Sequence, residues 1–582
     1  QALAFGREAC AVSIDSIAIG TSASASEVEA LAIGDGANAS NEKTVAIGLN
    51  AAASADSSTA LGTGSMASGL GAIALGNTSN ASGARGVAVG EESLVTGDNA
   101  TALGYEAFAE GEGAIAAGYD ADARGVASIA IGSEVLNGQP GDGSLVPSRT
   151  LARGDLSIAL GANATVFPGA DRAIAIGTYT FSTGEGAIAI GSDGDDAEAT
   201  FCITFDTDGV TCLVEGVSRQ VGAQAAGTYA VALGADSQAS AAGSLALGNA
   251  SGDRAIAAGN ASAATALQSI AIGDTAFSEG EDAISIGANS FTNSRGAIAV
   301  GSGTFAEADD AIALGSFAES TAARGVAIGE AAATSETDSI AIGTGASATD
   351  FAAVSIGRNA SADTGATLSL GNDSQASGAF VIAIGDGADS SGDRSLSLGY
   401  LANTQDRDSI AIGNTASTTA ADGIAVGNNA NSQGELAVAI GSQSTNGQDS
   451  NGDAVVVNTQ VSGVRSLALG VGAGTSATSD DAVAIGTFSG ADGVGAIAIG
   501  GDGSDVEDAF CITFDGDGVT CLVEGVSPEI GAQATGSYAV ALGTDSAADG
   551  SRSVAHGDGS FADGGNSIAL GHDASAENFG AV

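Results

Sequence analysis

The chain has 582 residues, of which 69 are acidic and 16 basic, so its formal net charge is −53 at pH 7. A surface this acidic repels nucleic acids and anionic membranes, which excludes both as direct partners. The chain has 90 glycines, 4 prolines and no tryptophan, yet 44% of its residues are hydrophobic. This composition favours a thin repetitive fold over a broad packed core, and its periodicity argues against disorder.

A five-residue motif, of which Ser16–Gly20 is one copy, recurs down the whole chain. The closing glycines from Gly6 to Gly132 lie 14 residues apart, and the same step holds from Gly273 to Gly441. There are 35 copies in all. A fixed short period predicts a solenoid, in which each repeat is one coil that buries its apolar surface by stacking on the next.

Each period contains two short stretches of alternating residues. Counted from the closing glycine, positions −3 and −1 are branched aliphatic residues such as Ile17 and Ile19, and positions +3 and +5 are small residues such as Ala23 and Ala25. Alternation with period two predicts two short strands per coil, and we expect all four of these side chains to face inward. Glycine fits the corner between the strands because it adopts positive φ without steric cost.

Position −2 is then expected to point away from the interior. It is Ala in 31 copies and Ser in the other four. This uniformity is either an echo of recent repeat expansion or a flat face on which other chains pack closely, as small residues permit. On the second interpretation, the face between chains includes Ala18, Ala32, Ala46, Ala74, Ala88, Ala271, Ala313, Ala327, Ala341 and Ala411.

The motif SIAIG followed by alanines, on a 14-residue period, resembles the head repeats of trimeric autotransporter adhesins of the YadA type. The resemblance covers nearly the whole chain. It implies an all-β fold, a left-handed parallel β-roll with two short strands in each 14-residue coil. It also implies a side-by-side homotrimer on a cell surface that mediates attachment, with no indication of the ligand. The chain has no heptad stalk and no stretch of 18 apolar residues, so we expect no direct membrane insertion by this chain.

The spacing breaks twice in the same order, at positions offset by 309 residues. This predicts a tandem duplication, with one super-repeat at residues 1–309 and a second at 310–582. Residues 133–160 and 442–469 are expected to form irregular coils with surface loops. Hairpin insertions are expected near 192–222 and 501–531, because alternating apolar residues there flank an Asp-Gly turn.

Each predicted hairpin carries two cysteines across its turn, which predicts the disulfides Cys202–Cys212 and Cys511–Cys521. Such bonds indicate an extracellular setting. Cys10, the fifth cysteine, stands at position +4, which is expected to point outward.

Acidic residues gather around both hairpins. They are either a solvated acidic turn or a Ca2+ site, because Ca2+ prefers several carboxylate ligands near a glycine turn. The candidate ligands are Asp193, Asp195, Asp206, Asp208, Asp502, Asp505, Asp515 and Asp517. No other cofactor is indicated.

Seven arginines stand at position −5, among them Arg324, Arg394 and Arg465. Their recurrence at one corner of the coil predicts ion pairs with carboxylates of adjacent coils or adjacent chains. The two histidines lie in the last coils, and no nucleophile with a paired base is present, so we expect no enzymatic activity.

These patterns favour an extracellular structural and adhesive protein, a trimeric head-like rod that attaches to surfaces, matrix or other cells. The alternative is a subunit of an extracellular filament that assembles by end-to-end stacking, because the chain opens and closes on apolar residues without a polar cap.

Overall fold

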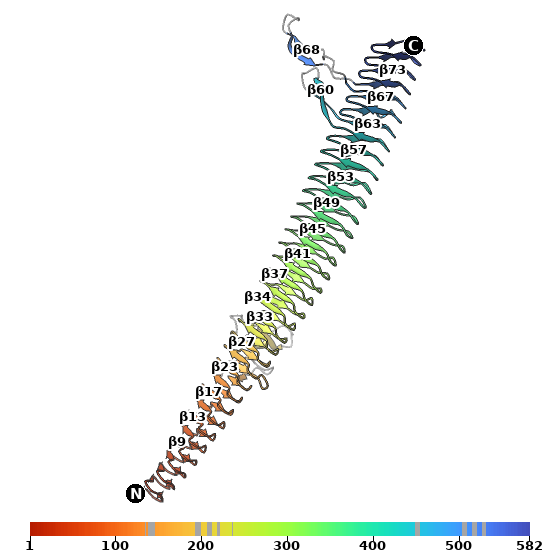
Figure 1. Ribbon diagram of the computed structural model, residues 1–582. Coiled ribbons are helices and arrows are strands. Elements are labelled where there is room, and N and C mark those ends of the chain that lie inside the picture. Colours follow the sequence, from red (N-terminus) through yellow and green to blue (C-terminus); the bar gives the residue numbers. More distant parts are fainter. Residues whose placement is uncertain are drawn as a thin grey trace. The chain divides into compact units, whose positions relative to one another are not determined.

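The computed structural model describes residues 1–133, 135–137, 146–192, 200–205, 212–217, 222–235, 237–448, 454–502, 509–514, 521–526 and 531–582. Within these residues all regular elements are β-strands. The chain divides into two compact units, Gln1–Ala297 and Ile298–Val582, and each is a parallel solenoid (Figure 1). The described residues contain no helix that could cross a membrane. The fold class expected from the sequence, an all-β solenoid, is confirmed.

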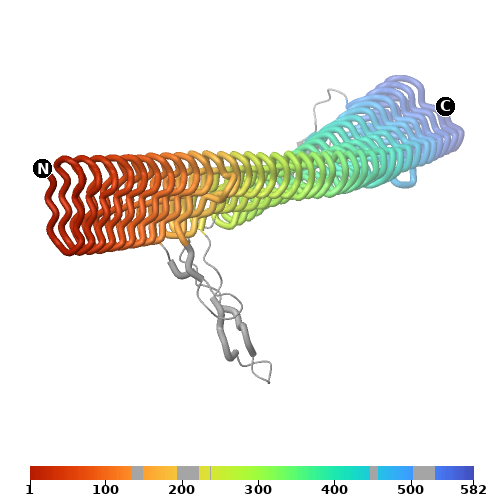
Figure 2. The backbone as a smooth tube through the Cα atoms, turned by 90° about the horizontal axis from the view of Figure 1, so that it is seen from below, coloured from red at the N-terminus to blue at the C-terminus, as the bar shows by residue number. Residues whose placement is uncertain are grey.

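A regular coil contains one strand of three residues at positions −3 to −1 and one strand of two residues at +4 and +5. In the first unit, β3 (Ile17–Ile19) pairs with β5 (Leu31–Ile33), and β4 (Ser24–Ala25) pairs with β6 (Asn38–Ala39). Both pairings are parallel and join residues 14 apart, so equivalent positions stack in columns. Figure 2 shows these coils as successive turns of one tube within each unit.

The three-residue strands form one of the two sheets in each unit. In the first unit the others are β1 (Leu3–Phe5), β7 (Val45–Ile47), β9 (Thr59–Leu61), β11 (Ile73–Leu75), β13 (Val87–Val89), β15 (Thr101–Leu103), β17 (Ile115–Ala117), β19 (Ile129–Ile131), β23 (Ile158–Leu160), β25 (Ile174–Ile176), β27 (Ile188–Ile190), β31 (Val231–Leu233), β35 (Ile270–Ile272) and β37 (Ile284–Ile286). In the second unit they are β39 (Ile298–Val300), β41 (Ile312–Leu314), β43 (Val326–Ile328), β45 (Ile340–Ile342), β47 (Val354–Ile356), β49 (Leu368–Leu370), β51 (Ile382–Ile384), β53 (Leu396–Leu398), β55 (Ile410–Ile412), β57 (Ile424–Val426), β59 (Val438–Ile440), β63 (Leu467–Leu469), β65 (Val483–Ile485), β67 (Ile497–Ile499), β71 (Val540–Leu542), β73 (Val554–His556) and β75 (Ile568–Leu570).

One coil of the first unit is shorter than the others. Its strands merge into β33 (Leu245–Ala250) and β34 (Ile256–Ala264), whose pairing shifts register between Leu247 and Asn249. The closing glycines at this place, Gly248 and Gly259, are 11 residues apart. The parallel columns resume after this shift, at Ile256 and Ile270.

The interior of the coil is lined mainly by alanine and serine, with a larger residue such as Val95 or Val381 in a few coils. In the coil around Gly20 the buried residues are Ser16, Ala18, Ala23 and Ala25, each fully shielded from solvent. They occupy positions −4, −2, +3 and +5, one parity of each strand. With alanine and serine at all four positions, the two strands of a coil lie too close together to admit isoleucine between them.

The inward direction expected for positions −3 and −1 is therefore wrong, whereas that expected for +3 and +5 is confirmed. The predicted alanine face between chains is also wrong. Its ten residues, Ala18, Ala32, Ala46, Ala74, Ala88, Ala271, Ala313, Ala327, Ala341 and Ala411, have no solvent exposure in the single chain. They face the opposite sheet of their own coil and present no surface to another chain.

The serines at position −2 confirm this orientation. Ser285 Oγ lies 2.7 Å from Ser290 Oγ, and Ser369 Oγ donates to the carbonyl of Ser374 at 2.9 Å. Both serines are fully buried. In these two coils the buried hydroxyl hydrogen-bonds across the coil, whereas Ser355 Oγ, at the same position, is buried without a partner among the described residues.

The glycine column has a second cause besides its backbone conformation. Gly20 has φ +134°, and a Cβ atom added there would lie 2.3 Å from the carbonyl oxygen of Gly34. A side chain at this corner would therefore collide with the next coil. The stacking distance itself requires glycine at this position.

Two-stranded antiparallel ribbons stand where the 14-residue spacing breaks. The pairs are β20 (Val135–Asn137) with β21 (Val146–Ser148), β28 (Thr200–Phe205) with β29 (Cys212–Val217), β60 (Ser444–Gln448) with β61 (Ala454–Val457), and β68 (Ala509–Phe514) with β69 (Cys521–Val526). The second and fourth pairs are the two hairpins expected from the sequence. The other two ribbons stand where only irregular loops were expected.

Candidate functional site

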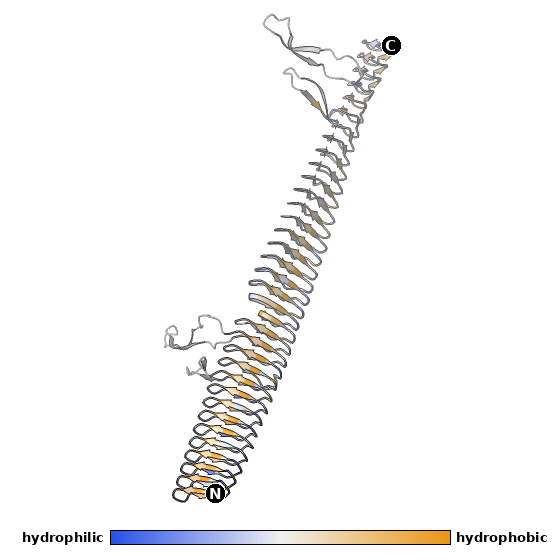
Figure 3. Cartoon of the chain, turned by 60° about the vertical axis from the view of Figure 1, so that its left-hand side comes forward, coloured by the Kyte–Doolittle hydropathy of each residue, from blue (hydrophilic) through white to orange (hydrophobic). Residues whose placement is uncertain are grey.

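The outward side of the three-residue strands is a continuous apolar face, which we call the aliphatic face. It consists of the side chains at positions −3 and −1, such as Ile410 and Ile412 in β55. Side chains along it include Ile73, Leu103 and Ile131 in the first unit, with exposed fractions of 40%, 42% and 44%. Figure 3 shows the apolar character concentrated on these strands in the first unit.

The parallel register makes the aliphatic face nearly continuous within each unit, with a few polar side chains such as Thr59, Thr101 and His556 on it. Ile410 is paired with Ile424 and Ile424 with Val438, so each side chain stands beside its equivalent in the next coil. Soluble monomers rarely expose contiguous apolar patches larger than a few hundred Å2, and larger ones mark contacts with other molecules. Two columns repeated over many coils exceed that size, so this face indicates an interaction surface.

The alternation along the strand was interpreted with the wrong side inward, because the largest apolar side chains, at positions −3 and −1, were expected to form the interior. His556 occupies position −1 in β73, a position expected to face inward, but it is exposed on the same face. The signal available in the sequence was that positions −4, −2, +3 and +5 are all small. Only a coil that places these four together has a uniform interior.

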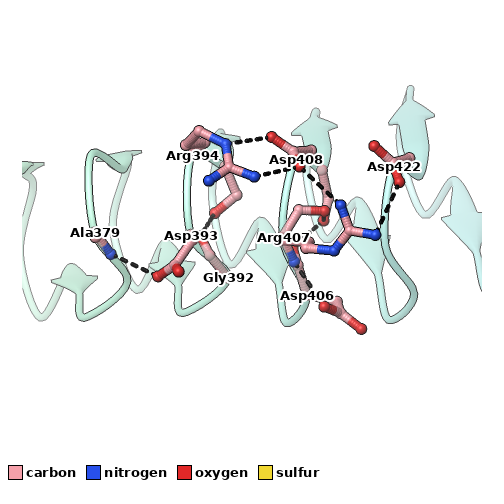
Figure 4. A network of polar contacts seen from close by, with 10 residues as sticks. Ala379, Gly392, Asp393, Arg394, Asp406, Arg407, Asp408 and Asp422 are labelled. Atoms are coloured by element: carbon pink, nitrogen blue, oxygen red, sulfur yellow. Dashed lines mark hydrogen bonds and ion pairs between the residues drawn. The ribbon is translucent and has the colours of Figure 1, made fainter.

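Arginines at one corner of the coil bridge successive coils, as the sequence predicted. Arg394 donates from Nε and Nη2 to the two carboxylate oxygens of Asp408, each at 2.6 Å (Figure 4). Arg407 donates to the same Asp408 at 3.2 Å and lies 3.7 Å from Asp422 in the next coil. Similar pairs join Arg324 to Asp338, Arg465 to Asp481 and Arg172 to Glu185.

A second ladder at the same turns uses backbone donors. The N–H of Ala379 donates to Asp393 Oδ1 at 2.9 Å, across one coil (Figure 4). The N–H of Ala84 donates in the same way to Asp98 at 2.8 Å. These carboxylates satisfy turn amides that face the neighbouring coil, so part of the negative charge of the chain holds the stack in register.

The arginine pairs predict a defined pH dependence. The hydrogen bond from Arg394 lowers the pKa of Asp408 below its ordinary value of 3.8. A carboxyl with a lowered folded-state pKa stabilises the fold fully above its unfolded pKa and loses that contribution as the pH falls through the folded one. Below about pH 4 we therefore expect the unfolding temperature of the unmodified chain to fall more steeply than that of Asp408→Asn.

Thermal unfolding followed by circular dichroism between pH 6 and pH 2 measures this difference. Asp406→Asn is the matched control, since it removes the same charge from the same turn, where Asp406 accepts the N–H of Arg407. Equal acid profiles for the unmodified chain and Asp408→Asn would show that the Arg394 pair contributes nothing to stability.

The candidate Ca2+ ligands lie almost entirely outside the described residues. Only Asp502 is described, and its N–H donates to the carbonyl oxygen of Thr487 at 3.2 Å. Within the described part of the chain, no three His, Cys, Asp or Glu side chains gather in a way that could hold a metal ion. The Ca2+ site remains a prediction.

The two disulfides also remain predictions, because the cysteine side chains of the hairpins lie outside the described part of the chain. The backbone register pairs Cys202 with Glu215 and Cys212 with Phe205. Cys10, in β2 (Cys10–Ala11), is exposed, as its outward position predicted, and it is a free cysteine in the single chain.

The chain was compared with models of protein families and with curated proteins. The model described as the YadA head domain repeat matches repeatedly between residues 11 and 134, 152 and 193, 225 and 360, 367 and 444, 477 and 502, and 534 and 578. These matches together cover well over half of the chain. No curated protein matches it.

Proposed function

Because the chain belongs to the YadA head domain repeat family, we propose that it is the head of a trimeric, adhesin-like protein exposed on a cell surface. The observation that carries this proposal is the aliphatic face, an apolar surface that a single chain leaves in water. Three chains placed side by side with these faces together would bury both columns. In this arrangement the small residues would form the interior of each single chain, and the branched aliphatic residues would form the interface between the three chains.

The proposed assembly suits attachment. Burying the aliphatic faces would leave the outward side of the two-residue strands and the charged turns exposed on all three chains. Identical binding surfaces repeated three times raise the effective affinity for a repetitive surface without any new contact. A strongly acidic exterior also keeps neighbouring heads from associating with each other.

A flow assay tests the adhesive role. Beads coated covalently with the purified chain are passed over surfaces of extracellular-matrix protein, acidic polysaccharide, neutral polysaccharide and bare glass. We expect more beads to be retained on at least one biological surface than beads coated with an unrelated acidic protein of similar charge. If the beads coated with the chain are retained no better than the control beads on any biological surface, an adhesive function is contradicted.

A further inference from the structure

Two grooves lie at equivalent places in the two super-repeats, on the outward side of the two-residue strands. The first, of about 360 Å3, is lined by Arg149, Arg153, Asn163, Thr165, Phe167 and Phe181. The second, of about 510 Å3, is lined at the positions 309 residues later by Asn458, Ser462, Gly472, Gly474, Ser476 and Gly490. The two grooves therefore come from one ancestral site by duplication.

The two grooves differ at every one of these positions, whereas the neighbouring hairpins do not. Residues 201–217 and 510–526 are identical except for Thr207 and Gly516. The first groove has two arginines and two phenylalanines where the second has an amide, two serines and a glycine. Positions outside the grooves differ as well, for example Leu156 and Arg465, so it is the different chemistry of the lining side chains that indicates different ligands.

Register fixes the floor and walls of the first groove. The strands β18 (Asp122–Ala123), β22 (Leu151–Ala152), β24 (Thr165–Val166) and β26 (Phe181–Ser182) stack in parallel, with Thr165 between Leu151 and Phe181. Thr165 and Asn163 are 3% and 4% exposed and supply a hydroxyl and an amide at the floor. The rings of Phe167 and Phe181, with centroids 6.3 Å apart, supply an apolar wall.

The arginines are held in place by two buried carboxylates. Arg149 Nε lies 2.6 Å from Asp120, and Arg153 Nη2 donates to Asp122 at 3.1 Å. The side chains of Asp120 and Asp122 are only 6% and 2% exposed. Each guanidinium carries five N–H donors, and the contact with its carboxylate described above uses one of them.

Arg153 also offers a specific donor. Its Nε is buried and has no hydrogen-bond partner within the described residues. A buried donor left without an acceptor is costly unless a ligand or water fills the place. An anchored pair of arginines beside such a donor matches an acid group, which a guanidinium binds through two parallel hydrogen bonds.

We propose that the first groove binds a saccharide carrying a carboxylate or sulfate group, and that the second groove does not. Arg149 and Arg153 would hold the acid group, Asn163 and Thr165 the ring hydroxyls, and the phenylalanines the apolar face of the sugar ring. This proposal rests on the proposed role in attachment and names its ligand class. Non-specific attraction does not explain such binding, because a chain of net charge −53 repels anions.

Isothermal titration of the purified chain tests the proposal with three probes: trigalacturonic acid, a sulfated galactose trisaccharide and neutral galactotriose. We expect saturable binding of one or both acidic probes, at one site per chain, and none of galactotriose. The two acidic probes distinguish a carboxylate from a sulfate as the preferred group. Absence of binding by both acidic probes, or binding at two equal sites per chain, would overturn the proposal.

The test variant is Arg149→Asn with Arg153→Ser, which installs the residues of the second groove. We expect at least a tenfold loss of affinity for the acidic probe. The matched control is Arg85→Asn with Arg254→Asn, which removes the same charge from two exposed turns of the same unit. Unchanged affinity in the test variant, or equal loss in the control, would overturn the assignment. Circular dichroism confirms that both variants are folded.

This measurement is made in solution and does not depend on attachment. If the beads are not retained but the acidic saccharide binds, the proposed adhesive function is wrong and the assignment of this ligand to the first groove is supported. If retention succeeds while no acidic saccharide binds, the groove assignment alone is wrong.

Discussion

Substituting aspartate for Ile410, Ile424 and Val438 is expected to convert the assembled protein into soluble single chains. These residues form one column of the aliphatic face in three successive coils. In a single chain their side chains are partly exposed, so the charges remain hydrated and the coil keeps its fold. In an assembly the same carboxylates would be buried together without partners, which is strongly unfavourable. Light scattering of the purified variant measures the change in mass.

The matched control places three aspartates on the opposite outward surface of the same coils. Gln405→Asp, Thr419→Asp and Gln433→Asp lie at exposed positions just after β54 (Asn403–Thr404), β56 (Ser417–Thr418) and β58 (Asn431–Ser432), which stack in the same register. We expect this variant to keep the mass of the unmodified protein. If both variants lose assembly, charge alone is responsible and the aliphatic face has no special role.

Enlarging the interior is expected to damage the single chain itself. Ala411 and Ala425 are fully buried and stacked in adjacent coils. Substituting leucine at each position should cost about 1–3 kcal/mol or more, because overpacking forces backbone shifts that propagate along the stack. A lowered unfolding temperature and new protease cleavage near these coils are the expected results.

The control for this prediction is Ile412→Leu, one residue away on the aliphatic face. Both changes place leucine in the same strand, but only Ala411→Leu points it inward. We expect Ile412→Leu to leave the unfolding temperature nearly unchanged. A larger effect of Ile412→Leu than of Ala411→Leu would mean that the parity of the strand is the reverse of the one described, and equal effects would contradict the difference in packing between the two sides.

The sequence predicts the period, the two strands per coil and the hairpins because these depend on local chemistry. A 14-residue step, alternating residues and a glycine at each corner leave little freedom in how one coil joins the next. The pairing of Arg394 with Asp408 was also predictable, since position −5 of one coil stacks on position −5 of the next. In each case the relevant contact follows from the repeat itself.

The direction of the side chains could not be predicted in the same way. Alternation in a strand shows that Ile17 and Ala18 face opposite ways, but it does not show which one faces inward. The rule that large apolar residues are buried holds for the complete assembly, whereas one chain is only part of it. Ile17 was therefore assigned to the coil interior, although the structure places Ala18 there.

The first groove escaped detection for a different reason. Its residues come from separate coils, with Arg149 in one and Phe181 two strands further along the stack. No local motif connects them. Comparison of the two super-repeats at their 309-residue offset does not single these positions out, because many other positions also differ, and their meeting in one groove depends on the register of β22, β24 and β26.

The mass of the unmodified chain in solution tests the central claim most directly, namely that the aliphatic face joins copies of this chain. Sedimentation equilibrium over a range of concentrations measures it. We expect a single species of three chain masses, each of 55.1 kDa. A species of one chain mass at all concentrations would contradict the claim, because the aliphatic face would then remain in water.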